Sequence, residues 1–216
     1  MLSKTLRTLT VAVAVALGAP FLASAAGPNG PGVPVVAPYV APTADEATDL
    51  AYMREEEKFA RDLYLRFAQE WETAPFAYIA NAEQSHMDAV LRLLRKYRLA
   101  DPAAGALVGE FSDPELQALY TALLQKGLAS ELDALLVGGL VEEADLLDLE
   151  ISAARTTKTD IDSVYANLAC GSRNHLRAFA ASVKAATGQA YIAQAMPQAA
   201  VDAILLKSWE RCGRTW

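Results

Sequence analysis

Cysteine and histidine are scarce in this chain, with two of each in 216 residues. Two cysteines exclude a four-thiolate zinc site, a rubredoxin-type iron site and a dense disulfide framework. Basic residues are also few: 19 Lys and Arg face 26 Asp and Glu, which gives a net charge of −7 without a basic stripe. The chain therefore lacks the positive surface of a nucleic-acid binder. Glycine (12 residues) and proline (10) are modest in number, which favours helices.

The composition is that of a folded protein that begins with an export signal. Apolar residues make up 53% of the chain and charged residues 21%, so a sizeable core is expected. Residues 1–25 are predicted to be the signal: Lys4 and Arg7 precede an apolar run at 9–17, and Ala23-Ser24-Ala25 is typical of a cleavage site. The apolar run is short for a membrane anchor. A secreted or periplasmic protein without a membrane span after signal removal is expected.

A linker is predicted to follow the signal. Residues 26–43 are rich in Pro, Gly and Ala, and neither helix nor sheet suits such a stretch. Export implies an oxidising compartment, where Cys170 and Cys212 either form a disulfide or remain two separate thiols. The sequence spacing leaves both alternatives open, because it does not specify geometry.

From residue 44 onward, apolar residues recur at spacings of three and four, which predicts an all-α chain. Four long helices and two shorter ones are expected: 44–71, 76–97, 130–154 and 160–186, with 114–126 and 197–209 between and after them. The first two long helices follow each other closely, as do the last two, and a long crossover joins the pairs. This connectivity predicts a ferritin-like four-helix bundle over residues 44–190, then a short helix and tail over 191–216. Gly138-Gly139 leaves the continuity of the third long helix open.

Acids and histidines interrupt the apolar stripes of these helices. On the second long helix, Glu83 and His86 occupy positions that the spacing reserves for apolar side chains, and they share one face. On the first, Glu57 is the favoured inward acid, and Glu56 is the alternative. The sequence thus predicts carboxylates and an imidazole inside the bundle.

The other two long helices add to this set. Glu142 and Asp145 share the predicted inner face of the third, and His175 lies on that of the fourth. Buried carboxylates need compensating positive charge, and no Lys or Arg lies near them on these stripes. We therefore expect a pair of divalent metal ions bound by Glu57, Glu83, His86, Glu142, Asp145 and His175.

These residues also carry a family resemblance. The run from Glu57 to Tyr64 resembles the Glu-x-x-Ala-Arg-x-x-Tyr of the first rubrerythrin helix, and Glu83-x-x-His86 and Glu142-x-x-Asp145 resemble its later motifs. More closely, residues 50–191 resemble a prokaryotic ferritin-like family catalogued only as a domain of unknown function, number 2202. The runs MREEEKFARDLY, IANAEQSHMDAV, VGGLVEEADLLDL and GSRNHLRAF carry that resemblance.

The resemblance implies a di-iron or di-manganese carboxylate protein that acts on peroxide, oxygen or Fe²⁺. A separate electron donor would be needed, because the cysteine count excludes a fused rubredoxin domain. One departure is Ser172, where the fourth helix of ferritin-like proteins usually has Glu. Either the site lacks one bridging carboxylate or Glu143 reaches inward. The departure leaves enzyme status open, with a non-catalytic metal-binding or surface interaction module as the alternative, and the oligomeric state is open as well.

Three further groups of residues are considered. Two of them have alternative roles, and the third is expected at the protein surface. Tyr64 is either a phenol beside the metal site or an ordinary core residue. Residues 173–174 either hydrogen-bond the carboxylates or form surface pairs. Arg54, Arg61 and Asp62 are expected on a solvated helix face.

Overall fold

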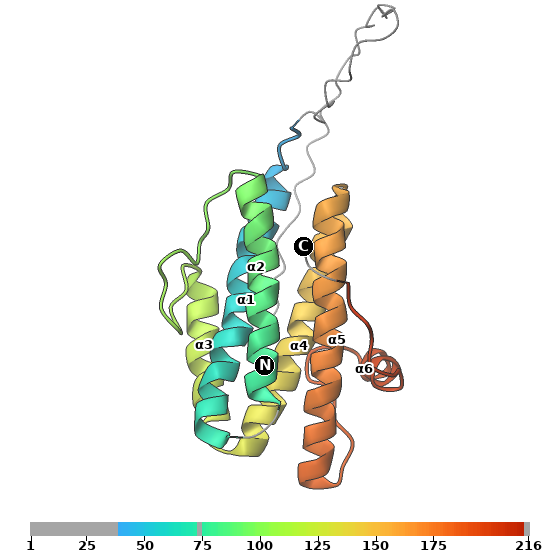
Figure 1. The fold of residues 1–216 in the computed structure, drawn as a ribbon. Coiled ribbons are helices and arrows are strands. Elements are labelled where there is room, and N and C mark those ends of the chain that lie inside the picture. The colour runs from blue at the N-terminus through green and yellow to red at the C-terminus, as the bar shows by residue number, and fades with distance from the viewer. Residues whose placement is uncertain (1–38, 73–74, 214–216) are drawn as a thin grey trace, which may run out of the picture. The chain divides into compact units, whose positions relative to one another are not determined.

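The structure is a computed structural model that describes residues 39–72 and 75–213. Within these ranges it contains six helices and no strand, so the predicted all-α class is confirmed. The helices are α1 (Ala44–Trp71), α2 (Phe76–Lys96), α3 (Pro114–Gly127), α4 (Glu131–Arg155), α5 (Thr159–Thr187) and α6 (Gln198–Leu205) (Figure 1). The predicted signal, residues 1–25, and residues 26–38 of the linker lie outside the described residues. None of the described helices is long and apolar enough to cross a membrane.

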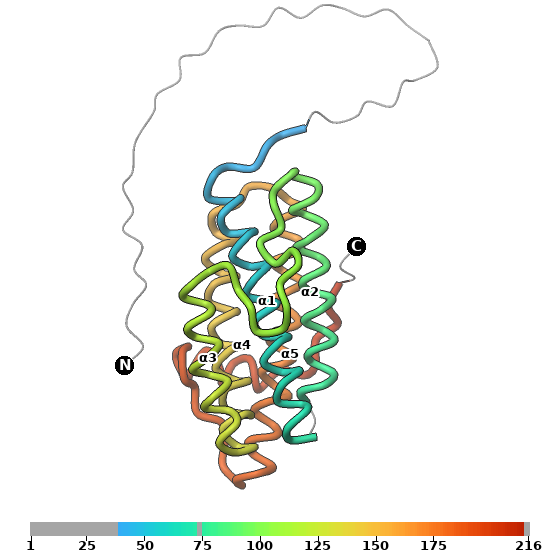
Figure 2. The backbone as a smooth tube through the Cα atoms, turned by 90° about the vertical axis from the view of Figure 1, so that its left-hand side faces the viewer, coloured from blue at the N-terminus to red at the C-terminus, as the bar shows by residue number. Residues whose placement is uncertain are grey.

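The four long helices form two hairpins. α1 packs along α2 and α4 along α5, and the hairpins meet where α1 faces α4 and α2 faces α5 (Figures 1 and 2). The crossover between the hairpins contains α3, which lies outside the bundle against α1 and α4. This is the predicted four-helix arrangement of two antiparallel hairpins with a short helix in the crossover.

Helix α4 is continuous through Gly138-Gly139, which settles that open point. A Cβ atom at Gly138 would strike the ring of Phe179, and one at Gly139 would strike the hydroxyl group of Tyr191. The two glycines therefore let aromatic side chains approach the helix backbone. The helix tolerates their lower propensity because the packing requires the space.

Two apolar clusters fill the bundle, one toward each end. One is rich in aromatic residues and includes Tyr64, Phe67, Phe76 and Phe179. The other is mainly aliphatic and draws on residues such as Leu50, Met53, Val90, Leu94, Leu149, Ile161 and Leu168. On α1, α2 and α5, the predicted metal ligands lie between the residues that enter one cluster and those that enter the other. On α4, Leu146 of the aromatic-rich cluster follows Asp145, and Leu149 of the aliphatic cluster comes next. The bundle therefore places one polar layer between two apolar ones.

The charged face of α1 was expected to be solvated, and this prediction is wrong for Arg54 and Asp62, which are buried. Lys58, 1% exposed, donates from Nζ to the carbonyl oxygens of Leu107 and Glu110 at 2.7 and 3.0 Å. Asp62 accepts from the backbone N–H of Gly109 at 2.9 Å. Arg54 pairs with Asp101 at 3.0 Å. This face of α1 thus binds the crossover through the crossover's peptide groups.

The C-terminal segment is fastened to α5. Cys170 and Cys212 form a disulfide with Cα atoms 5.6 Å apart, which answers the open question about the two thiols. Glu210 accepts from Arg173 at 2.6 Å and from Arg177 at 2.7 Å. Asn174 accepts from the backbone N–H of Glu210 at 3.0 Å. Residues 173–174 therefore hold the tail rather than the buried carboxylates. Helix α6 ends at Leu205, four residues before the predicted end.

Candidate metal centre

The structure brings the six predicted ligands into the polar layer between the two apolar clusters. Each long helix contributes at least one of them, and all six are buried, from 2% exposed for Glu83 to 8% for His86. The site residues are Glu57 on α1, Glu83 and His86 on α2, Glu142 and Asp145 on α4, and His175 on α5.

Glu83 occupies the centre of this layer. Its Oε2 lies 2.7 Å from Nδ1 of His86, and its Oε1 lies 2.8 Å from Nδ1 of His175. Glu57 approaches Nδ1 of His86 at 3.2 Å, and Glu142 approaches Nδ1 of His175 at 3.4 Å. Two groups of three ligand atoms result, each with its atoms within 4.8 Å of one another: Glu57, Glu83 and His86, and Glu83, Glu142 and His175. The two groups share Glu83.

The contacts of His175 with Glu83 and Glu142 lack the geometry of a hydrogen bond, whereas the contact of His86 with Glu57 has it. Oε1 of Glu83 and Nδ1 of His175 are close, yet both atoms are buried without a hydrogen-bond partner, as is Oε1 of Glu57. Such atoms are costly in a protein interior unless something else compensates them. Two ligand atoms bound at about 2.1 Å to one ion, at a right angle, would lie roughly 3 Å apart. The spacing of these unpartnered atoms thus fits ligands that point at a common ion.

The histidines and Glu83 hold opposite charges in the metal-free site. Burial raises the pKa of Glu83, but the two imidazoles outweigh burial and the pKa is lowered from its usual value. Burial also lowers the pKa of each imidazole, and the neighbouring carboxylates outweigh it. The pKa of His86 is raised well above its usual value, and that of His175 is raised to about 10. Protons on the imidazoles therefore supply positive charge where a metal would.

The three other carboxyl groups of the layer, those of Glu57, Glu142 and Asp145, favour their neutral forms. Burial raises the pKa of Glu57 and that of Glu142, against the opposing effect of the histidines. Burial and the charge of Glu142 raise the pKa of Asp145 to about 8. Near neutral pH, the metal-free layer thus holds several protons that metal binding would displace.

Asp145 lies outside both three-residue groups. Its Oδ2 is 2.5 Å from the hydroxyl oxygen of Ser172, the residue at which the sequence resemblance led us to expect Glu. Ser172 is 1% exposed and also donates to the carbonyl oxygen of Leu168 at 2.9 Å. The position of the expected second bridging carboxylate is therefore occupied by a serine that contacts Asp145.

Both candidate acids of α1 are buried, but they face different neighbours. Glu57 contacts His86, whereas Glu56 lies near Asp148, whose carboxyl group acts on the pKa of Glu56. The structure thus brings Glu57, the favoured residue, to the histidines. Glu56, which is buried, and Asp148, which is partly buried, form a second acid pair that the sequence reasoning did not identify. A signal was present, because Asp148 continues the three-residue spacing of Glu142 and Asp145.

Glu143 does not reach into the site, which overturns that alternative. Its carboxylate accepts from the hydroxyl group of Tyr191 at 2.7 Å and from the backbone N–H groups of Gln194, Ala195 and Met196. Glu143 is 0% exposed. It therefore anchors the segment that follows α5 to the outer side of α4.

Two other residues shape the layer. The hydroxyl group of Tyr64 donates to Oε1 of Glu142 at 2.6 Å, so this phenol touches a candidate ligand. A Cβ atom at Gly171 would come within 2.5 Å of both Cε1 and Nε2 of His86. Gly171 lies one helical turn before His175, and its missing side chain leaves the space in which the other imidazole lies. This role depends on packing between helices, which the sequence does not reveal.

Comparison with known proteins gives the chain a family. A family model described as "Uncharacterized protein domain (DUF2202)" matches residues 46–208. The chain is 44% identical over 167 residues to "Uncharacterized protein MJ0754" of Methanocaldococcus jannaschii, a match that covers 77% of this chain and 90% of the relative. The crystal structure of hypothetical protein MJ0754 from the same archaeon matches with a TM-score of 0.77 at 42% identity, over 81% of this chain and 99% of that one. The family predicted from the sequence motifs is confirmed, and the chain belongs to the uncharacterized protein domain family DUF2202.

Proposed function

We propose that the protein binds two divalent transition-metal ions, iron or manganese, in the polar layer of the bundle. The observation that carries the proposal is the position of Glu83, whose two carboxylate oxygens each approach a different histidine. One ion would be held by Glu57, Glu83 and His86, and the other by Glu83, Glu142 and His175. Glu83 would bridge them.

The donor set supports this choice of metal. Carboxylates combined with imidazoles suit iron and manganese, and the set contains no thiolate that would favour softer metals. Helical bundles build dinuclear sites from a Glu on each of two helices and Glu-x-x-His on the other two. Here α1, α2 and α4 supply that pattern, and α5 supplies the histidine alone. Five of the six ligands of the pattern are thus present at matching positions.

Bound iron or manganese would supply redox chemistry toward peroxide, oxygen or Fe²⁺. The protein's own contribution is to keep the ligands in place and the layer dry. The apolar clusters on both sides exclude water, Tyr64 fixes Glu142 through its hydrogen bond, and Gly171 admits the ring of His86. We propose that electrons come from the substrate or from a separate donor protein.

A non-catalytic metal-binding module is the second candidate. The observation that favours it is Ser172, because α5 supplies a serine where the di-metal pattern has a second Glu-x-x-His carboxylate. A site with fewer bridging ligands would hold its metals more weakly and constrain their redox changes less. Metal binding without turnover would support this candidate.

We propose further that the protein acts outside the cytoplasm, in the periplasm or as a secreted protein. The proposal rests on the sequence of residues 1–25 and on the disulfide between Cys170 and Cys212, a bond typical of oxidising compartments.

Elemental analysis of the purified protein, before and after loading with Fe²⁺ or Mn²⁺, tests the metal site. We expect two ions per chain in the native sequence. Glu83→Gln should lose both, because it removes the shared ligand, and His86→Ala should lose mainly one. Asp88→Asn is the matched control, because Asp88 lies on the exposed face of the same helix and accepts a hydrogen bond from Gln84.

Full loading of Glu83→Gln after dialysis against a chelator would show that the layer is not a metal site. Given bound metal, the two candidate functions are separated by turnover. Peroxide consumption or Fe²⁺ oxidation that Glu83→Gln abolishes supports the redox enzyme, and its absence from the loaded native protein supports the binding module.

A further inference from the structure

Three acids follow one another along α4 and lead out of the metal layer. Glu142, Asp145 and Asp148 are spaced by three residues, so each lies about 4.5 Å farther along the helix than the one before. Their burial decreases in the same order: Glu142 is 2% exposed, Asp145 is 7% exposed, and Asp148 is only partly buried. The acids thus connect the candidate ligand Glu142 with the protein surface.

Glu56 faces this row from α1. It is 7% exposed, it lies near Asp148, and its Oε2 has no hydrogen-bond partner. The charge of Asp145 also acts strongly on Glu56. Two carboxylates offer only acceptors to each other, and carboxylate oxygens are ligands that divalent cations take readily. The unpartnered, buried oxygen of Glu56 therefore marks a place where a passing cation would be stabilised.

The surroundings of the acid row are also negative. Glu56, Asp148, Asp113 and Glu115 all act on the hydroxyl group of Tyr52, which places the acidic start of α3 near the outer end of the row. The base that acts on Asp148 is Arg155, and its guanidinium is paired with Asp49 at 3.1 Å. A local excess of one charge sign attracts ions of the other sign and raises their rate of arrival.

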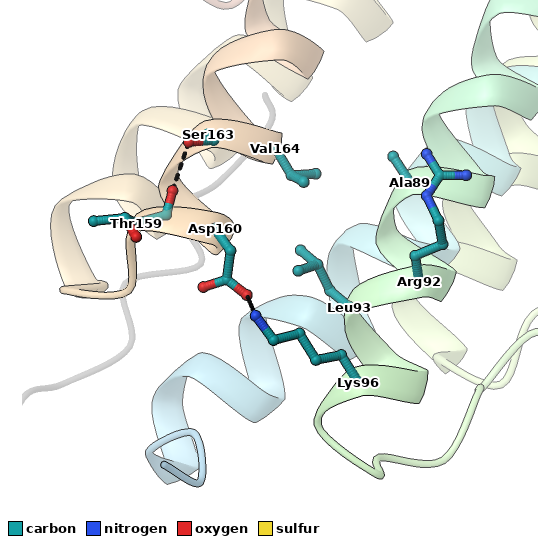
Figure 3. Close-up of a pocket in the computed structure, with 8 residues that line it drawn as sticks. All are labelled: Ala89, Arg92, Leu93, Lys96, Thr159, Asp160, Ser163 and Val164. Atoms are coloured by element: carbon teal, nitrogen blue, oxygen red, sulfur yellow. Dashed lines mark hydrogen bonds and ion pairs between the residues drawn. The ribbon is translucent and has the colours of Figure 1, made fainter. Parts of the chain in front are cut away.

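The boundary between α2 and α5, which we call the α2–α5 seam, lies opposite the α1–α4 seam and carries a different charge. Between α2 and α5 lies a cleft of about 350 Å³ lined by Arg92 and Lys96, with apolar side chains such as Leu93 and Val164 (Figure 3). Its single acid, Asp160, is bound by Lys96 at 2.7 Å. A divalent cation would meet net positive charge there. The α1–α4 seam therefore suits cations and the α2–α5 seam does not.

We propose that Asp148 and Glu56 form the uptake route for divalent cations, which pass from this pair to Asp145 and then to Glu142 and Glu57. The inference rests on the proposed metal-binding function and adds the path by which the buried layer is filled. Asp148 and Glu56 act in transit: they hold the ion briefly and are not ligands in the loaded protein.

Stopped-flow loading of the metal-free full chain with Co²⁺, followed by cobalt absorption, tests this route. Asp148→Asn and Glu56→Gln should each slow loading by about tenfold, the lower end of what electrostatic guidance supplies. The final cobalt-to-protein ratio should equal that of the native sequence. Glu150→Gln is the matched control, because Glu150 is an exposed acid two residues from Asp148 on the same helix. It should load at the native rate, as should Arg92→Gln.

The outcomes separate the two proposals. If the native chain takes up no cobalt, the metal site itself is wrong. If the native chain loads but Asp148→Asn and Glu56→Gln load as fast as Glu150→Gln, the route is wrong and the site stands. If either variant lowers the final ratio, that acid is a permanent ligand and the transit role is refuted. Repeating the loading measurements at high salt separates long-range attraction from direct contact. Salt should weaken the long-range attraction of the cation, whereas a direct contact with Asp148 or Glu56 should still make the native chain load faster than the variants.

Discussion

Gly171→Ala is a sharp test of how the two histidines are placed. The change adds one methyl group to the interior of α5, and that carbon would lie 2.5 Å from Cε1 and Nε2 of His86. Non-bonded carbon atoms normally lie at least about 3.5 Å apart, so the imidazole ring of His86 must move away by about 1 Å. Metal–ligand bonds tolerate shifts of only about 0.2 Å. We therefore expect the ion held by Glu57, Glu83 and His86 to be lost or greatly weakened.

The effect of Gly171→Ala on stability should depend on His86. Alanine in a helix interior is about 1 kcal/mol more favourable than glycine, whereas overpacking a buried site costs about 1–3 kcal/mol. In the metal-free native background, the free energy of unfolding should therefore fall by about 0–2 kcal/mol. In the His86→Ala background the imidazole ring is absent, so Gly171→Ala should raise the free energy of unfolding by about 1 kcal/mol. The sign of the effect thus reverses between the two backgrounds.

Urea unfolding of the four metal-free proteins measures this coupling, and elemental analysis after iron loading measures the site. Gly127→Ala serves as a control, because its added carbon strikes Phe67 in the aromatic cluster instead of a ligand. It should lower stability and leave the metal ratio unchanged. The reasoning is refuted if Gly171→Ala binds metal as the native protein does, or if its effect on stability is equal in both backgrounds.

The other expected outcomes concern pH and Glu143. In metal-free protein, the pKa of Asp145 is raised to about 8 and that of His175 to about 10. Each folded-state group keeps a proton that the unfolded chain has lost, so the free energy of unfolding falls as pH rises. The fall extends over about pH 4 to 8 for Asp145 and about pH 6.5 to 10 for His175. Thermal melts from pH 5 to 8 should show a falling Tm for the metal-free form and a widening gap to the loaded form, and a level or rising metal-free Tm would contradict this. Glu143→Gln should lower the free energy of unfolding by about 2 kcal/mol, since its amide group would face backbone N–H donors. Metal content should stay unchanged, and metal loss without destabilisation would place Glu143 in the site after all.

The inward-facing part of the molecule was predictable from the sequence because helical periodicity decides which residues point inward. Apolar side chains at spacings of three and four fixed the helix bounds to within a few residues, apart from the end of α6. The same spacing placed Glu83, His86 and His175 in core positions, and the structure brings them together. The spacing of residues within one helix is enough to show which side chains face inward, without knowing which residues they contact on other helices.

The contacts that the sequence did not predict involve partners without a pattern. Lys58, Asp62 and Glu143 bind backbone carbonyl and N–H groups of loops. Every residue carries these groups, so no spacing of side chains reveals which loop will approach which helix. A buried charge on the outer side of a helix therefore has the same sequence signature as a solvated one. Glu143 differed from Glu142 only by its direction on the helix.

The pairing of Ser172 with Asp145 determines how the candidate centre departs from the ferritin-like pattern. A serine hydroxyl has one hydrogen, and that of Ser172 lies within hydrogen-bond distance of both the Leu168 carbonyl oxygen and Asp145 Oδ2. Both contacts are satisfied together if the serine donates to the carbonyl and Asp145 keeps a proton that it donates to the serine. The pKa of about 8 fits a protonated Asp145 at neutral pH. Asp145 would then become a charged ligand only when an arriving cation displaces its proton. The predicted ligand role of Asp145 therefore depends on occupancy of the layer, whereas Glu83, with its lowered pKa, is already charged before any ion binds.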